Sequence, residues 1–324
     1  MQVTLASWYT ISIMTGVAKV LSVAPIGFDG SLIEVEADSS RGLPSLQIVG
    51  LGNKAIDEAK ERVRSAIKNS LLEFPIQKIT INLAPAELPK DGTHYDLAIA
   101  LAILTTSGQL RQTEVDDAVF AGELALDGGL RPIKGAITVA ETAKHAGLKC
   151  VYLPSKNVEQ AALVSGVEII GIDSLKSLYL HLKKEIIIAP YQVPKKRLIK
   201  ISKTSESLLD DIHGQEQAKR ALVIAAAGHH NILLAGSPGA GKTMLAKTLV
   251  SLLPPLSDEE QIASTKLHSL AGELIEDVAK MGTFRPPNDT ACRRVLIGCG
   301  PTPKPGKLSW AHVGFLLFTG IPYS

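Results

Sequence analysis

One stretch of the sequence, GSPGAGKT at residues 236–243, has the residue types and the spacing G-x-x-x-x-G-K-[ST]. Glycines in this pattern let backbone N–H groups wrap a phosphate, the lysine neutralises phosphate oxygens, and the hydroxyl coordinates Mg²⁺. The residues predicted to bind the nucleotide are Gly236, Ser237, Pro238, Gly239, Ala240, Gly241, Lys242 and Thr243. The sequence therefore predicts an ATP site, with Mg²⁺ held through the Thr243 hydroxyl.

The segments on either side of this loop distinguish it from an ordinary glycine-rich turn. HNILLAG at 230–236 is apolar and of strand length, and we predict a buried strand there. TMLAKTLVSLL at 243–253 has the spacing of an amphipathic helix that Pro254 and Pro255 end. Strand, loop and helix in this order are the context that a phosphate-binding loop requires.

A further helix is predicted just before that strand, over GQEQAKRALVIAAAGHH at 214–230. It ends in His229 and His230, a pair that could suggest a metal site or a catalytic role. We favour a different interpretation, in which both side chains lie at the negative end of the helix dipole, where they are stabilised.

The composition limits the class of protein. The chain has 324 residues, 45% hydrophobic and 20% charged, which is typical of a globular protein with two domains. Its net charge of +2 gives no overall electrostatic footprint for nucleic acid, and the 4% of aromatic residues argues against base stacking as a main theme. The three cysteines are odd in number and form no C-x-x-C pair, which favours a reducing cytoplasm.

The N-terminus carries an apolar stretch that lacks the positive region of a secretory signal. Residues 1–16 are predicted to be an unstructured leader, or the result of a start assigned too early, with Met14 as the true start. The apolar run LAIALAIL at 97–104 is too short to span a bilayer and indicates a buried helix. We therefore predict no membrane association.

The first half of the chain alternates predicted strands and helices, which indicates an α/β domain. A hairpin is predicted within 20–37, turning at Asp29-Gly30, because apolar Ile33, Val35 and Ala37 alternate with polar residues. The further predicted strands lie at 46–50, 78–85, 150–154 and 167–172, with a second hairpin at 119–133. The predicted helices follow Asn53 and lie near 96–106, 136–146 and 157–165.

Residues 184–209 differ from both halves and are predicted to be an interdomain linker. They contain prolines, a serine-rich stretch and a basic cluster. The basic residues are Lys195, Lys196, Arg197, Lys200 and Lys203. This cluster could contact a phosphate backbone, but a charged run in a linker is most often solvated, and we favour that interpretation.

Two separate regions of the sequence resemble one family in the same order. DIHGQEQAKRALVIAAAGHHNILLAGSPGAGKTMLAKTL is similar to the ATPase core of the magnesium-chelatase-like AAA+ proteins of the YifB/ComM type. The first half is similar to the N-terminal region of that family in three segments. These are EVEADSSRGLPSLQIVGLGNKAIDEAKERVRSAIKNS, ITINLAPAELPKDGTHYDLAIALAIL and FAGELALDGGLRPIKGA. The resemblance runs from about residue 17 to the end.

The resemblance implies a fold and a function. The expected fold is α/β, with a Lon-protease-like N-terminal domain followed by an incomplete P-loop AAA+ domain. Family members work as ATP-driven hexameric rings, and ComM-type members are associated with DNA branch migration. The expected partners are therefore ATP, DNA and further copies of the chain. The predicted divisions are a leader at 1–16, the Lon-like domain at 17–183, the linker at 184–209 and the partial AAA+ domain at 210–324.

The kinship with Lon raises a second hypothesis, serine proteolysis. Lon-type catalysis needs a serine activated by a lysine, because an unassisted hydroxyl is a weak nucleophile. The serine follows a K-D-G-x turn in Lon-like sequences, and KDGTHYD has His94 at that position. The position of the partner lysine carries Ile137, while Lys134 lies elsewhere. His94 with Asp96 could suggest another site, but without a nucleophile we predict a non-proteolytic scaffold or partner-binding module with no catalytic residue.

The sequence departs from the family where ATP hydrolysis would occur. Relatives carry two histidines where FRPPNDT has Asn288 and Asp289, and an apolar strand ending in Asp-Glu where FLLFTG has Thr319 and Gly320. The aspartate holds the Mg²⁺ water shell and the glutamate polarises the attacking water. Loss of a general base typically costs about 10²–10⁴ in rate, so we expect impaired hydrolysis.

The chain also ends before the family's sensor residues and its arginine finger, which is worth roughly 10³–10⁵ in NTPases. We expect an eroded or truncated copy, with an incomplete sequence as the alternative. The main hypothesis is thus an ATP-binding, cytoplasmic YifB/ComM-like protein of DNA processing. The alternative is a non-enzymatic interaction module that retains the N-terminal domain.

Overall fold

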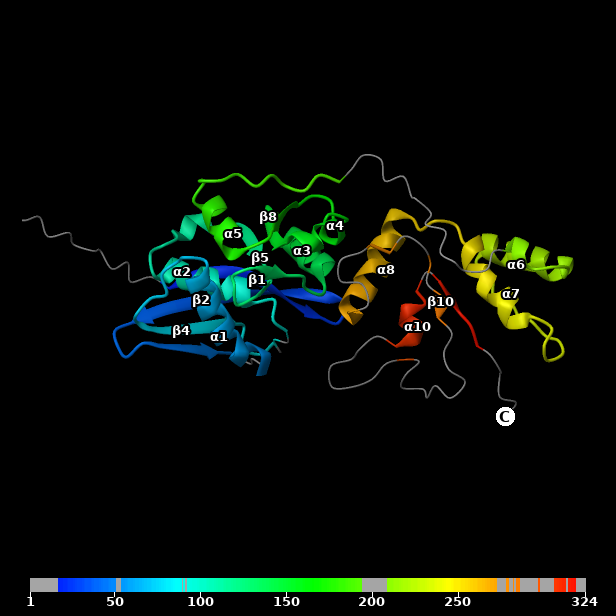
Figure 1. Ribbon diagram of the computed structural model, residues 1–324, viewed down its shortest axis with the longest axis horizontal. Helices are drawn as coiled ribbons and strands as arrows, with labels where there is room; N and C mark the ends of the chain where they lie inside the picture. Colours follow the sequence, from blue (N-terminus) through cyan, green and yellow to red (C-terminus); the bar gives the residue numbers. More distant parts are fainter. Residues whose placement is uncertain are drawn as a thin grey trace, which may run out of the picture. The chain divides into compact units, whose positions relative to one another are not determined.

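The computed structural model describes residues 17–50, 54–88, 90, 92–193, 209–272, 278–279, 282, 284–285, 297, 306–312 and 314–318 (Figure 1). The chain divides into two compact units. The first holds the described residues up to Ser22, Ile33–Leu130 and Ser174–Ile187. The second holds Val23–Leu32, Arg131–Asp173 and the described residues from Ile188 onward.

The first unit is built on strands that a period-two pattern of apolar residues specifies. The hairpin end of two of them, Val23–Leu32, belongs to the second unit. These strands are β1 (Ala18–Ile26), β2 (Asp29–Ser40), β3 (Ser45–Val49), β4 (Lys78–Ala84) and β5 (Ala118–Phe120). They lie in the order β3-β4-β2-β1-β5. β4 pairs parallel with β3 and antiparallel with β2, where Leu83 lies opposite Val35, and β1 pairs parallel with β5. Because Ile79, Ile81 and Leu83 alternate with polar residues, one face of β4 is fully buried.

The first hairpin turns two residues earlier than predicted. β1 ends at Ile26 and β2 begins at Asp29, so the turn is Gly27–Phe28, and Gly27 has a left-handed φ of 61°. Gly30 lies inside β2 instead. A Cβ there would come within 2.1 Å of the Thr142 hydroxyl oxygen, so this glycine serves close packing and makes no turn.

Helices cover these strands in the first unit (Figure 1). They are α1 (Lys54–Asn69), α2 (Asp96–Thr106) and α5 (Leu175–Leu182), with a 3₁₀ turn at Gln112–Glu114. α1 buries Ala59, Val63 and Ala66 at helical spacing, and it packs against α2. α2 is apolar all round and buried from Asp96 to Leu104, as the run at 97–104 predicts. β6 (Glu123–Leu124) and β7 (Leu130–Arg131) form the predicted second hairpin.

The second unit contains the remaining α/β elements. These are α3 (Ala136–His145), β8 (Cys150–Pro154), α4 (Val158–Ala161) and β9 (Glu168–Ile172). β8 and β9 pair in parallel. α4 is shorter than the helix predicted near 157–165, because a 3₁₀ turn occupies Ser155–Asn157 and the chain turns again after Ala161. The Tyr191 N–H donates to the Ile169 carbonyl on β9 at 2.7 Å.

The residues from 209 onward are mostly helical in the described part. The structure places a 3₁₀ turn at Leu209–Asp211, α6 at Glu216–Gly228, α7 at Lys242–Thr248, a 3₁₀ turn at Leu249–Leu252 and α8 at Asp258–Ala271. α10 (Lys307–Trp310) follows, and β10 (Phe284–Arg285) pairs in parallel with β11 (Phe315–Leu316). The prolines after Leu253 end the α7 segment as predicted.

Two predicted strands differ in this region. HNILLAG at 230–236 forms no strand, and Leu233 is 77% exposed. Ile232 and Leu234 do pack against a buried cluster, so the segment keeps the alternation of a strand although it joins no sheet among the described residues. The apolar run near the end of the sequence contributes only the two residues of β11 among those described.

Candidate nucleotide-binding site

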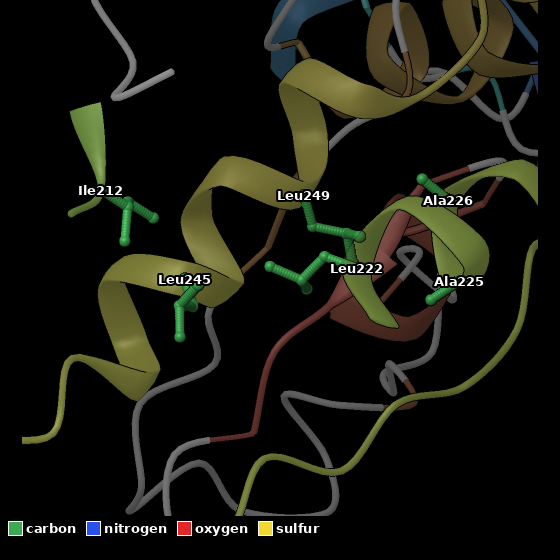
Figure 2. Packing of buried hydrophobic residues seen from close by; sticks show 6 residues of the cluster. All are labelled: Ile212, Leu222, Ala225, Ala226, Leu245 and Leu249. Carbon is green, nitrogen blue, oxygen red and sulfur yellow. The ribbon is translucent and has the colours of Figure 1, made fainter. Parts of the chain in front are cut away.

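The phosphate loop lies between two helices that share a small apolar core. Leu222 and Ala225 of α6 meet Leu245 of α7 and Leu249 just after it (Figure 2). Leu222 is fully buried in this cluster. The packing fixes the start of α7, and therefore the carboxyl end of the loop, against α6.

Two glycines give the loop its backbone shape. Gly239 and Gly241 have φ angles of 81° and 80°, which side chains with a Cβ rarely adopt. A Cβ would meet no atom within 4 Å at either position, so the requirement is conformational and not steric. The Ala240 N–H closes the turn by donating to the Ser237 carbonyl at 3.3 Å.

Lys242 folds its side chain back over the loop. Its Nζ donates to the carbonyl oxygens of Gly236 and Ser237, both at 2.8 Å. The lysine is the first residue of α7, and Gly241 is the residue that caps the helix. The ammonium group thus lies on the same side as the amino end of the helix, where positive charge and backbone N–H groups favour an anion.

The remaining loop residues are open to solvent. Ser237, Pro238 and Ala240 are exposed, and Thr243 on the first turn of α7 is exposed as well. The structure therefore brings all eight predicted residues, 236–243, into one continuous loop and helix start. The strand that was predicted to precede them is not formed, so the loop is supported from the α6–α7 side.

The residues expected to affect hydrolysis lie outside the described part of the chain. These are Asn288, Asp289, Thr319 and Gly320. The predicted leader at 1–16 and the basic cluster of the linker, between Lys195 and Lys203, lie outside it too. The impairment of hydrolysis therefore remains a prediction from residue types.

The position that corresponds to the Lon serine is a buried one. His94 is 7% exposed and its ring lies 4.0 Å from that of Tyr95. Asp96 is 1% exposed and forms a two-pronged ion pair with Arg62, at 2.8 Å and 3.2 Å. Ile137, at the position of the partner lysine, is fully buried. Asp96 is thus bound to Arg62, which argues for a structural role.

Burial raises the pKa of Asp96 to about 6, while the hydrogen bond and charge of Arg62 oppose that rise. The Leu124 N–H also donates to this carboxylate, at 3.3 Å. Sequence reasoning missed Arg62, because it lies 34 residues away from Asp96 on another helix. Nothing in the sequence indicated that Arg62 pairs with Asp96, because other charged residues lie on the same predicted helix face.

Two protein families match the chain, one in each half. The family described as subunit ChlI of Mg-chelatase matches residues 35–157. The family described as magnesium chelatase, subunit ChlI, matches residues 208–323. The YifB protein of Escherichia coli is 42% identical over 301 residues, which are 92% of this chain and 58% of YifB. The competence protein ComM of Haemophilus influenzae is 39% identical over 308 residues, 94% of this chain and 60% of ComM.

The chain belongs to the magnesium-chelatase-like family of the YifB/ComM type. The order of the two halves is the one that the sequence resemblance indicated. This magnesium-chelatase-like chain spans about 60% of the length of the relatives it matches.

A more distant relative fits the fold of the N-terminal region. The Lon protease of Mycolicibacterium smegmatis is 28% identical over 150 residues, 44% of this chain and 18% of that protein. Together with the strands and helices described above, this match confirms the α/β fold class of the magnesium-chelatase-like chain. Within the described ranges, every helix is too short or too polar to cross a bilayer.

Proposed function

We propose that this chain binds ATP with Mg²⁺ at residues 236–243. The observation that carries the proposal is the shape of the loop, in which two left-handed glycines precede a helix and Lys242 places its ammonium over the turn. Backbone N–H groups at such a helix start favour a phosphate, and the lysine supplies the matching charge. The family assignment supports the same ligand.

The residues present fit an ATP–Mg²⁺ complex. Lys242 would exchange its bonds to the Gly236 and Ser237 carbonyls for phosphate oxygens, which accept a stronger, charge-assisted hydrogen bond. The exposed Thr243 hydroxyl would hold the metal. Mg²⁺ neutralises phosphate charge when it is bound.

Removing the lysine tests this site. Calorimetry on the full chain with an ATP analogue and Mg²⁺ should show binding that Lys242→Ala weakens at least about 10-fold, because a charge-assisted contact to phosphate is lost. Lys247→Ala is the matched control, since Lys247 is exposed on the same helix and should leave affinity unchanged. If Lys242→Ala leaves the affinity unchanged, or if the chain does not bind the analogue, the proposed site would be overturned.

We further propose that hydrolysis is impaired. Thr319 and Gly320 stand where the family carries its acidic pair, and neither supplies a carboxylate to polarise water. Steady-state ATP turnover should therefore be far below the order of 1 per second that is ordinary for enzymes. Turnover near that value, abolished by Lys242→Ala, would contradict the proposal.

For the cellular role, we propose a cytoplasmic, ring-forming protein of DNA processing. Similarity to the competence protein ComM supports it, and the comparison extends over both halves of the chain. Native mass spectrometry with the ATP analogue should show an oligomer, and a branched DNA should be retarded in a gel at low salt. If the chain stays monomeric and does not bind the branched DNA, the result would favour a non-enzymatic interaction module.

A further inference from the structure

Helix α8, in the second unit, buries a polar face. Ser264, Thr265, His268 and Ser269 are each at most 2% exposed, although such residues are usually found at the surface. The helix itself is well specified, because Ser257 and Glu260 form a capping box at its start and Gly272 ends it with a φ of 79°. A stable helix that buries hydroxyl groups requires partners for them.

Ser269 finds its partners at the start of α3 and on α4 of the same unit. The Thr265 hydroxyl accepts from the Ala279 N–H at 2.9 Å, and the Ser264 hydroxyl has no partner among the described residues. The Ser269 hydroxyl accepts a hydrogen bond from the Gly135 N–H at 3.0 Å and donates to the Gln160 side-chain oxygen at 3.1 Å. Gly135 immediately precedes α3 and has no side chain that could accept a hydrogen bond at the start of that helix. Ser269 instead supplies a hydroxyl group there from α8. One serine therefore joins α8 to two helices.

Two charged contacts flank this serine. The Lys266 ammonium pairs with the Glu141 carboxylate on α3. At the other end, a Cβ added to Gly272 would lie 2.6 Å from Lys134 Nζ, so the ammonium lies beside the carboxyl end of α8. A cation is favourable there because of the helix dipole. The contact between α8 and α3 thus includes a buried hydrogen bond and an ion pair.

The chain connects this contact to the phosphate loop through a short, stiff path. α7 starts at Lys242, and the 3₁₀ turn that follows it packs against both α6 and α7. Pro254 and Pro255 then restrict the backbone before Ser257 caps α8. This path would carry to α8 any shift of α7 that accompanied the turn of Lys242 from the loop carbonyls to a phosphate.

We propose that α8 couples the phosphate loop to α3 and α4, so that nucleotide loading changes how tightly the Ser269 face docks. The inference rests on the proposed ATP site. A polar contact suits such a switch, since its hydrogen bonds are exchanged for bonds to water when it opens, whereas an apolar contact would lose its burial. Because coupling is reciprocal, the factor by which nucleotide shifts the docking equilibrium is also the largest factor by which loss of docking can change nucleotide affinity.

Hydrogen exchange of the nucleotide-free full chain tests the docking itself. Ser269→Ala should raise exchange of the amides around 135–139 about 5-fold or more, the factor expected for one lost hydrogen bond. Glu259→Gln, on an exposed position of α8, should leave it unchanged. Lys266→Glu should also raise it, and Glu141→Lys in the same chain should restore protection. Unchanged exchange in Ser269→Ala and Lys266→Glu would overturn the docking.

Adding adenylyl imidodiphosphate with Mg²⁺ tests the coupling. In the wild-type chain, exchange across 135–161 should change at least 2-fold, and Ser269→Ala should remove the change and shift the analogue's affinity by up to the same factor. Calorimetric binding without any change at 135–161 would overturn the coupling and leave the ATP site intact. Absence of binding would overturn the proposed function and this inference together.

Discussion

At the scale of single residues, the ion pair of Arg62 and Asp96 shows how burial changes chemistry. The carboxylate is 1% exposed, and desolvation raises its pKa to about 6 in spite of the guanidinium beside it. An acid whose pKa rises on folding binds more protons in the folded state. Its contribution to stability is therefore complete below about pH 4 and declines as the pH rises to about 6.

Asp96→Asn should remove this dependence on pH and also destabilise the fold, because the amide NH₂ cannot accept one of the two hydrogen bonds that Arg62 donates. The free energy of urea unfolding should be lower for the variant at pH 4.5. The gap to the wild type should shrink by about 2 kcal/mol as the pH rises from 4.5 to 6.5. Asp38→Asn, on an exposed position of β2, serves as control. A gap that stays constant over this range would rule out the raised pKa.

Cys150 is a second residue whose environment alters its reactivity. Burial and a hydrogen bond to the Glu168 carboxylate raise the pKa of its thiol to about 11. The thiolate is the reactive form, so Cys150 should be alkylated slowly at pH 8. Glu168→Gln should speed its alkylation severalfold, measured on the Cys150 peptide by mass spectrometry. An unchanged rate would show that burial alone governs the thiol.

At the scale of elements, the phosphate loop depends on the packing of α6 against α7. Leu222 lies within the buried cluster of that contact (Figure 2) and is itself fully buried. Its neighbour Val223 is 46% exposed. The loop has no paired strand before it among the described residues. The start of α7 is thus held mainly by this apolar cluster.

Leu222→Ala should cost about 2–5 kcal/mol of local stability, because it removes buried methyl groups and leaves a cavity. Val223→Ala should change stability by only about 0.5 kcal/mol, since the side chain is largely exposed. Hydrogen exchange in α6 and α7 measures both effects. If the two variants proved equivalent, the cluster would not be what supports the loop.

At the scale of the whole molecule, the chain from 17 to 193 contains all strands from β1 to β9. Its last described residues bond to β9 through the Tyr191 N–H. α5 buries Leu175 and Leu178, and the Leu175 N–H donates to the Gly128 carbonyl, so α5 ties the end of this stretch to its middle. These contacts predict independent folding of this stretch, which the interaction-module hypothesis requires.

A fragment of residues 17–193 should therefore unfold cooperatively, whereas one of residues 17–173 should be insoluble because it lacks α5. The longer fragment should still melt below the full chain, since Ser269 no longer covers Gly135. Circular dichroism and thermal melts provide the comparison. Failure of the 17–193 fragment to fold would contradict the boundary placed after the α/β elements.

The sequence by itself determined the features that local patterns encode. Alternation at Ile79, Ile81 and Leu83 predicted β4, helical spacing predicted α1, and the loop spacing predicted the eight residues of the candidate site. The resemblance of both halves of the chain to one family was also confirmed. Motifs at fixed spacing can be read from the sequence because they involve only neighbouring residues.

Only the tertiary structure decided which distant groups meet. The pairing of Arg62 with Asp96 and the polar docking of Ser269 join residues 34 and 134 positions apart, and no local pattern encodes such contacts. The segment at 230–236 has the composition and alternation of a strand, yet a strand forms only where a neighbour accepts its backbone hydrogen bonds. The local sequence indicates which helix or strand is favoured. Whether that element forms depends on the hydrogen-bonding and packing partners that the tertiary structure brings to it.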